Sequence, residues 1–224
     1  GSGKTTLLRI LAGVLEPSAG EVEVLGVRRP ARSGGAARRA LRRGTSYLSQ
    51  DPALDPEMTG GETLALAAAL YGLPRRARRR RVAELAAGFG LDGHLGRRVS
   101  AWSGGLKRRL HLAAGLVHDP ELLLLDEPTA GLDPEGTRRL WADLAARAAR
   151  GGAVAIVSHD LPAVERHAAR VALLDRGALV ACGPPTEVRR LGDGTTAPDL
   201  GEAFRRRTGR PPEDLLPPPP RGRR

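Results

Sequence analysis

Two blocks of sequence decide the fold: Trp102–Arg109, which is WSGGLKRR, and Leu122–Asp133, which is LLLLDEPTAGLD. The first block predicts a Ser-Gly-Gly turn that opens a helix, where backbone N–H groups and the positive helix end attract anions. The second block predicts an apolar strand that ends in Asp126 and Glu127, so two carboxylates reach one edge of a sheet. Phosphate and magnesium chemistry requires both features.

Length and composition set the outer limits of the interpretation. The 224 residues suit one α/β domain with a helical lobe, and the single Cys182 excludes an internal disulfide framework. The nearly apolar run Leu64–Leu73 is shorter than the ~18–20 residues that span a bilayer. We therefore expect a chain that does not cross a membrane, a cytoplasmic location, and any pore in another polypeptide.

The net charge of +11 and the pI near 11.3 raise the possibility of a nucleic-acid partner. The arginine runs Arg75–Arg81 and Arg205–Arg207 lie in Ala-rich, helical segments with few aromatic residues and no base-reading arrangement. A solvated arginine-rich face, near anionic lipid headgroups or simply in water, is therefore the preferred interpretation. We expect no nucleic-acid partner.

The hydrophobic pattern predicts alternating helices and strands, with an inserted Ala- and Leu-rich helical lobe at about 62–109. Continuous apolar runs of strand length are typical of central strands in a parallel sheet. The residues 210–224 form a Pro/Arg-rich tail, which we expect to be disordered. The expected helices are Thr5–Ala12 and about 134–150, and the expected strands are Glu21–Leu25, Thr45–Ser49, Leu122–Leu125, Ala153–Val157, and a hairpin of Val171–Leu174 with Ala178–Ala181.

The chain begins inside a phosphate-binding pattern. In the P-loop G-x-x-x-x-G-K-[ST], Gly3, Lys4 and Thr5 fill the last three positions, so we expect the first three positions and the preceding strand to lie upstream of residue 1. The loop backbone wraps phosphates, the Lys reaches the β and γ oxygens, and the Thr hydroxyl binds magnesium. The expected ATP-binding residues are Gly1, Ser2, Gly3, Lys4, Thr5 and Thr6.

With His159 in the segment Ile156–Asp160, these motifs together resemble the ATP-binding subunit of ATP-binding cassette (ABC) transporters, over residues 1–209. The resemblance implies an α/β P-loop NTPase with a mostly parallel central sheet, and ATP and Mg²⁺ as ligands. Glu127 would polarise the attacking water, since a general base must lie within hydrogen-bond distance of its proton. The other implied roles are magnesium binding by Thr5, Gln50 and Asp126, catalytic support by Gln50 and His159, contact with a partner's ATP by Ser103, Gly104 and Gly105, and an interface loop at Asp133.

The resemblance is closest to subunits that energise drug, antibiotic or polysaccharide exporters. It rests on Met58–Leu64, Leu70–Pro74, Ser103–Leu110 and Ala203–Gly209. Trp102 and Leu106 depart from the usual signature residues but leave Ser-Gly-Gly intact. The implied partners are a second ATP-binding subunit in a homodimer and an integral membrane permease, at the cytoplasmic face of the membrane.

Three alternatives remain open at this stage. A DNA-repair or chromosome-structure ATPase shares the motifs but inserts long coiled coils, whereas about a hundred residues separate Lys4 from Ser103 without sustained heptads. A translation-associated ATPase normally carries two cassettes. An inactive fragment is the third alternative, because the P-loop is incomplete.

Overall fold

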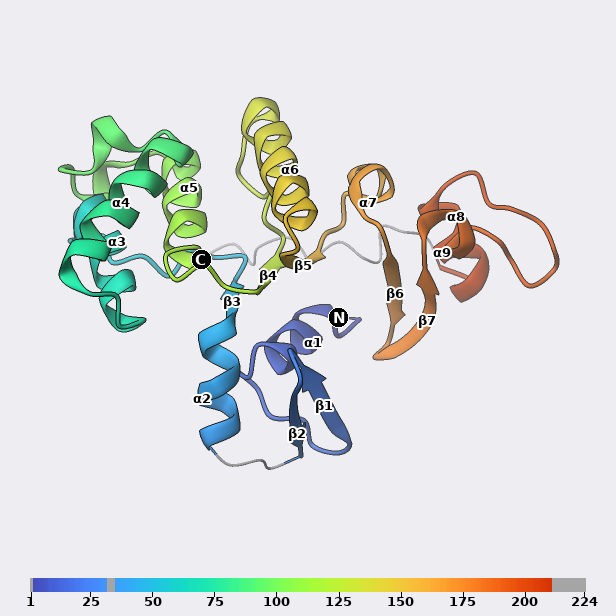
Figure 1. Cartoon of the computed structure of the whole chain (residues 1–224). Helices are drawn as coiled ribbons and strands as arrows, with labels where there is room; N and C mark the ends of the chain where they lie inside the picture. The colour runs from blue at the N-terminus through green and yellow to red at the C-terminus, as the bar shows by residue number, and fades with distance from the viewer. Residues whose placement is uncertain (1, 32–34, 211–224) are drawn as a thin grey trace, which may run out of the picture. The chain divides into compact units, whose positions relative to one another are not determined.

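The computed structural model describes residues 2–31 and 35–210 (Figure 1). The chain divides into two compact units, one made of Leu8–Ile156 and the other of Gly1–Leu7 with Val157–Arg224. Gly1 and the expected disordered tail, except Arg210, lie outside the described residues. In the part of the chain that the structure describes, no helix is long and apolar enough to cross a membrane.

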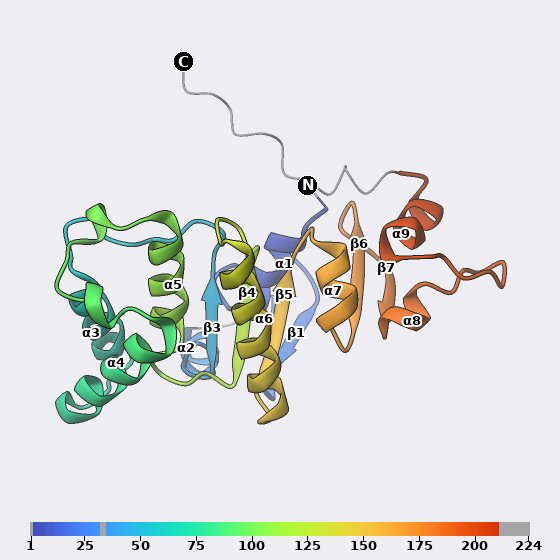
Figure 2. The same cartoon turned by 90° about the horizontal axis from the view of Figure 1, so that it is seen from above.

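The larger unit is built on a three-stranded sheet in the order β3-β4-β5, with β3 at Thr45–Leu48, β4 at Leu122–Asp126 and β5 at Ala153–Val157. β3 and β4 are parallel, and their register ends where Leu48 pairs with Leu125. Leu123, Leu124 and Leu125 are at most 1% exposed, because β4 is the central strand. Helix α6 (Pro134–Ala149) lies over this sheet (Figure 2). The three predicted strands are therefore present, within a residue of their expected ends.

A second, two-stranded sheet precedes β3. β1 (Glu21–Val24) and β2 (Val27–Pro30) are antiparallel and are joined by Leu25 and Gly26, which have φ of 51° and 72°. Two consecutive left-handed residues form the tight turn that matches the twist of a hairpin. The sequence predicted β1 as Glu21–Leu25, but not β2 or the following helix α2 (Gly35–Gly44).

The helical lobe contains α3 (Gly60–Leu70), α4 (Arg75–Phe89) and α5 (Gly104–Gly115), with two short 3₁₀ turns, η1 (Asp92–His94) and η2 (Val99–Ala101). These helices pack together at one side of the larger unit (Figure 1). A Cβ at Gly60 would lie 2.5 Å from the Trp102 ring, so the close approach of α3 to this ring requires glycine. The apolar core consists of Leu64, Ala68, Leu85, Ala86, Leu91, Val99, Trp102, Leu110, Ala113 and Val117.

The arginine-rich segments lie mostly at the surface. Arg75, Arg76, Arg79 and Arg80 on α4 are exposed, and Arg80 forms an ion pair with Glu84 at 3.3 Å. Exposed pairs of this kind contribute little to stability, because water screens them. The arrangement is that of the solvated face expected from the sequence.

The smaller unit contains α7 (Leu161–His167), β6 (Val171–Asp175), β7 (Ala178–Gly183), α8 (Pro185–Val188) and α9 (Leu200–Thr208). β6 and β7 form the predicted hairpin, with Arg176 and Gly177 in left-handed turn conformations. Its core contains Val171, Leu173, Val188, Leu200 and Phe204. Helix α1 (Lys4–Leu11) begins in this unit, within a residue of the expected Thr5–Ala12, and Gly13, with φ of 68°, follows its end.

Candidate functional site

The two predicted carboxylates lie at the carboxyl end of the central strand. Asp126 is 4% exposed and Glu127 is 7% exposed, so neither carboxylate is at a freely solvated turn. Glu127 has φ of 49°, a left-handed conformation that is uncommon for a residue with a Cβ. The Glu127 carbonyl accepts a hydrogen bond from the Ala130 N–H at 3.2 Å, which closes the turn after the strand.

Gln50 lies beside this strand end, because parallel β3 stops at the same edge of the sheet as β4. Gln50 is exposed, and its backbone carbonyl accepts a hydrogen bond from Arg108 at 2.9 Å. Arg108 also donates to Glu127. The structure therefore places Gln50, Asp126 and Glu127 at the same edge of the sheet.

Arg108, on α5, is the buried cation of this site, with 3% exposure. Burial lowers the pKa of its guanidinium, and the carboxylate of Asp126 partly opposes that shift. All of its hydrogen bonds go to backbone carbonyls. The acceptors are Ser49 at 3.0 Å, Gln50 at 2.9 Å, Asp126 at 3.4 Å, Glu127 at 2.7 Å and Pro128 at 3.0 Å.

The Ser-Gly-Gly turn begins α5, as predicted. Ser103 is the N-cap residue, and its hydroxyl accepts a hydrogen bond from the Leu106 N–H at 3.3 Å. A Cβ at Gly104 or Gly105 would meet nothing within 4 Å, so packing within the chain does not require glycine at either position. The first turn of the helix is therefore open to a group from outside the chain.

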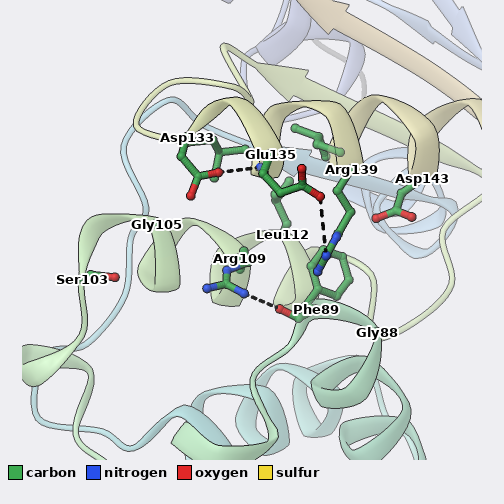
Figure 3. A pocket seen from close by; sticks show the side chains of 13 residues that line it. Gly88, Phe89, Ser103, Gly105, Arg109, Leu112, Asp133, Glu135, Arg139 and Asp143 are labelled. Atoms are coloured by element: carbon green, nitrogen blue, oxygen red, sulfur yellow. Dashed lines mark hydrogen bonds and ion pairs between the residues drawn. The ribbon is translucent and has the colours of Figure 1, made fainter.

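A pocket of about 290 Å³ lies between α5, the end of α4 and the start of α6 (Figure 3). Ser103, Gly105 and Asp133 line it, so two of the predicted partner-facing motifs share one pocket. Asp133 caps α6, because its Oδ1 accepts a hydrogen bond from the Gly136 N–H at 2.6 Å. Burial raises the pKa of the Asp143 carboxyl in this pocket, and the charge of Arg139 opposes the shift.

The predicted ATP-binding residues Ser2, Gly3, Lys4, Thr5 and Thr6 belong to the smaller unit. Gly3 has φ of 90°, α1 begins at Lys4, and the Lys4 Nζ donates a hydrogen bond to the Ser2 hydroxyl at 2.6 Å. A glycine in this conformation lets the chain turn tightly into the helix start, where N–H groups favour phosphate.

His159 also belongs to the smaller unit. It lies between β5 and α7 in the chain and is exposed. The next residue, Asp160, caps α7 by accepting a hydrogen bond from the Ala163 N–H at 3.1 Å. The turn is further fixed by a bond from the Asp160 N–H to the Ser158 hydroxyl at 3.1 Å. His159 therefore lies in a hydrogen-bonded turn, two residues after the end of β5.

Comparison with known proteins identifies the family. Residues 1–130 match the protein-family model described as "ABC transporter". The chain belongs to the ABC transporter family. The predicted family and fold class are therefore confirmed.

Similar proteins include ATP-binding proteins named for Nod factor export and for daunorubicin resistance. The chain is 38% identical over 185 residues to Nod factor export ATP-binding protein I from Neorhizobium galegae, covering 83% of this chain and 52% of that protein. It is 39% identical over 191 residues to daunorubicin resistance ATP-binding protein DrrA3 from Streptomyces coeruleorubidus, covering 84% of this chain and 58% of that protein. The chain therefore spans little more than half the length of these curated relatives.

A solved structure supports the same family. The structure titled "Structure of ATP binding subunit of ABC transporter" superimposes with a TM-score of 0.82 at 28% identity. The superposition covers 92% of this chain and 84% of that chain. Both units described above thus follow the fold of an ABC transporter subunit.

Arg108 was not predicted as a site residue. It lies in the Ser-Gly-Gly block of the sequence, but no role was expected for it. A signal was present, because Arg108, Leu112 and Gly115 recur at helical spacing and all three are buried. An arginine on the buried stripe of a helix requires acceptors, which here are the carbonyls at the ends of β3 and β4.

Proposed function

We propose that the whole protein binds and hydrolyses ATP as the nucleotide-binding subunit of an exporter-type ABC transporter. The observation that carries this proposal is the pair of buried carboxylates, Asp126 and Glu127, at the carboxyl end of the central strand. Relatives named for Nod factor export and daunorubicin resistance support the export direction. Transport then uses the energy of ATP binding and hydrolysis.

The donor set fits magnesium that arrives with the nucleotide. Among the residues that the structure describes, no three His, Cys, Asp or Glu side chains cluster as a metal site. Mg²⁺ is commonly held by one or two carboxylates, with phosphate oxygens and waters completing its octahedron. When bound, Mg²⁺ neutralises charge that develops on the phosphate oxygens. We assign its protein ligands to Asp126, the Thr5 hydroxyl and the Gln50 side chain.

The residues of the chain have separate roles in the proposed hydrolysis. Glu127 takes the proton of the attacking water, because its position directly after the strand places a carboxylate beside the predicted metal ligand Asp126. Gln50 orients that water, and His159 contacts the γ-phosphate and supports the catalytic geometry. Lys4 binds the β and γ oxygens. The backbone of residues 1–6, including Gly1, Ser2, Gly3 and Thr6, wraps the phosphates.

The open first turn of α5 supports a composite site. Ser103, Gly104 and Gly105 would contact the γ-phosphate of ATP held by a second copy of this subunit, in a head-to-tail homodimer. Asp133, which shares a pocket with Ser103 and Gly105, would lie at the dimer interface. The proposed third component is an integral membrane permease that docks against residues 51–59 and holds the protein at the cytoplasmic face of the membrane.

The lengths of the helices favour transport over the coiled-coil ATPases of DNA repair. Among the described residues, the longest helix is α6, with 16 residues. A 16-residue helix is about 24 Å long, far shorter than a coiled-coil arm. Among the described residues between Lys4 and Ser103, the α-helices α1 to α4 have 8 to 15 residues.

The test replaces Glu127 by Gln in the whole protein. Loss of the base should lower kcat for ATP hydrolysis by about 10²- to 10⁴-fold while ATP binding persists, so that an ATP-bound dimer accumulates. Phosphate release and analytical size-exclusion chromatography measure the two effects. Unchanged phosphate release would remove Glu127 from its assigned role.

Glu121→Gln is the matched control. Glu121 is an exposed carboxylate that directly precedes the same strand, at its amino end. The chemical change is identical, but it occurs away from the proposed site. We expect wild-type hydrolysis from this variant.

A further inference from the structure

Arg108 is a buried charge that donates hydrogen bonds to backbone carbonyls. It is 3% exposed, and the charges of Asp126, Asp51 and Glu127 oppose the lowering of its pKa by burial. Burying a cation is costly unless hydrogen bonds compensate for the lost water. The guanidinium donates to five backbone carbonyls, four of them at 2.7–3.0 Å and that of Asp126 at 3.4 Å.

These carbonyls belong to two separate segments, residues 49–50 and 126–128. The parallel pairing of β3 with β4 ends at Leu48 and Leu125, so the sheet no longer joins the two segments beyond that point. Arg108 connects them there instead. One side chain thus holds together the backbones that present Gln50 and Glu127.

The Glu127 backbone is in the left-handed region, with φ of 49°. This conformation is strained for a residue with a Cβ and persists only where its surroundings enforce it. The bond from Arg108 to the Glu127 carbonyl, at 2.7 Å, is charge-assisted and therefore strong. Arg108 thus stabilises the conformation that sets the direction of the Glu127 side chain.

Arg108 also belongs to the helix that begins at Ser103, five positions upstream. We infer that Arg108 is a positioning residue for hydrolysis, which fixes the helix that contacts the partner's nucleotide to the backbones of Gln50 and Glu127. The inference rests on the proposed function. Closure of α5 on the partner's nucleotide and orientation of the general base Glu127 then occur as one movement.

The test measures kcat and ATP affinity separately for Arg108→Gln and Arg108→Lys in the whole protein. Misplacement of a base by about 1 Å costs up to ~10²-fold, so we expect kcat to fall about 10- to 100-fold in Arg108→Gln. Affinity for a non-hydrolysed ATP analogue should stay within about threefold, because Arg108 acts on the base. Lysine should recover little of the loss, since an ammonium group cannot reproduce the planar fork.

Arg81 provides the matched control at the other end of α5. Its guanidinium donates to the carbonyls of Leu116 at 2.8 Å and Val117 at 3.3 Å, away from the strand ends. Arg81→Gln therefore removes the same kind of contact. We expect it to lower stability and leave kcat unchanged.

A double-mutant cycle and hydrogen exchange distinguish positioning from general support. In a Glu127→Gln background, Arg108→Gln should cause no further loss of kcat, because both changes act on the same step. The amides of Asp126, Glu127, Thr129 and Ala130 should exchange faster in Arg108→Gln, whereas Arg81→Gln should affect residues 116–118. If Arg108→Gln fails to fold, Arg108→Lys serves for each measurement.

The outcomes separate the two proposals. A wild-type protein without ATPase activity overturns the proposed function, and this inference with it. If the wild type is active and the Arg108 variants have the same kcat as Arg81→Gln, only the inference is overturned. An additive loss in the Glu127→Gln background does the same, because Arg108 would then act independently of the base.

Discussion

The helical lobe and the carboxyl ends of β3 and β4 differ in what they bury. The lobe buries apolar side chains around Leu64, Leu110 and Trp102, each at most 4% exposed. The strand ends bury Arg108 and the two carboxylates instead. Apolar burial stabilises a fold by about 25 cal/mol per Å², whereas buried charges cost free energy.

Within the larger unit, the residues that stabilise the fold therefore differ from those that are proposed to act in hydrolysis. Charged groups that are buried at a cost, around a strained backbone, are typical of a functional site. The exposed arginines of α4 contribute more to the net charge than Arg108 does, but they are solvated. Changes in the lobe should therefore alter the free energy of unfolding, and changes at the strand ends should alter kcat.

Leu64→Ala should produce the largest change in stability. Leu64 is fully buried on α3, so its truncation leaves a cavity and should lower the free energy of unfolding by about 2–5 kcal/mol. Urea unfolding followed by Trp102 fluorescence, in a Trp141→Phe background, measures the change. The kcat of the remaining folded protein should not fall.

Leu66→Ala is the control for this prediction. Leu66 lies two residues further along the same helix and is 47% exposed, so its truncation should cost less than about 0.5 kcal/mol. Equal losses from the two variants would contradict the assignment of Leu64 to the core. A large fall in kcat from Leu64→Ala alone would show that the lobe and the strand ends are not separate.

The elements that local patterns specify were predictable from the sequence. Four leucines before Asp126 identified β4 as a buried strand, and Ser103 before two glycines identified the start of α5. β2 and α2 were missed. The sequence of β2, VRRP, has little apolar content, and among the α2 side chains that the structure describes Leu41 alone is fully buried.

The candidate site was predictable only in part. The motifs located Gln50, Asp126 and Glu127, but Arg108 joins carbonyls that are up to 59 residues away in sequence. Such contacts depend on the register of two strands, which no local pattern specifies. The left-handed backbone conformation of Glu127 was also not predictable from the sequence, because glutamate does not favour this conformation.

His111, on α5 between the two regions, should make stability depend on pH. Burial lowers its pKa to about 4, and the charge of Arg108 acts in the same direction. Its Nδ1 is buried and makes no hydrogen bond within the described residues. Between the ordinary pKa of about 6.5 and pH 4, the unfolded chain binds a proton that the folded chain does not.

The free energy of unfolding should therefore fall as the pH drops from 6.5 to 4, by at most about 3 kcal/mol from this group. The full contribution is present above pH 6.5, where His111 is neutral in both states. Replacing His111 by Leu should flatten the urea-derived stability curve across this window. Parallel curves for the variant and the wild type would exclude His111 as the source.

Thr59→Ala should have a smaller effect than Leu64→Ala or the titration of His111, because it removes a hydrogen bond at the start of α3 and no apolar core contact. The Thr59 hydroxyl accepts a hydrogen bond from the Glu62 N–H at 3.2 Å, and the Glu62 Oε2 accepts one from the Thr59 N–H at 2.8 Å. This capping box satisfies two donors at the start of α3, and its loss should cost about 1 kcal/mol. Thr59→Ser keeps the hydroxyl and should retain most of the stability.

The same box lowers the pKa of Glu62, first through the backbone N–H of Thr59 and then through its hydroxyl. Thr59→Ala removes only the second of these contacts, so the pKa should rise but stay below its ordinary value. Because this carboxylate is favoured in the folded state, its contribution is present at neutral pH and is lost as the pH falls. The cost of Thr59→Ala should accordingly be larger at pH 7 than at pH 3, and an equal cost at both would show that the ionised Glu62 takes no part in the cap.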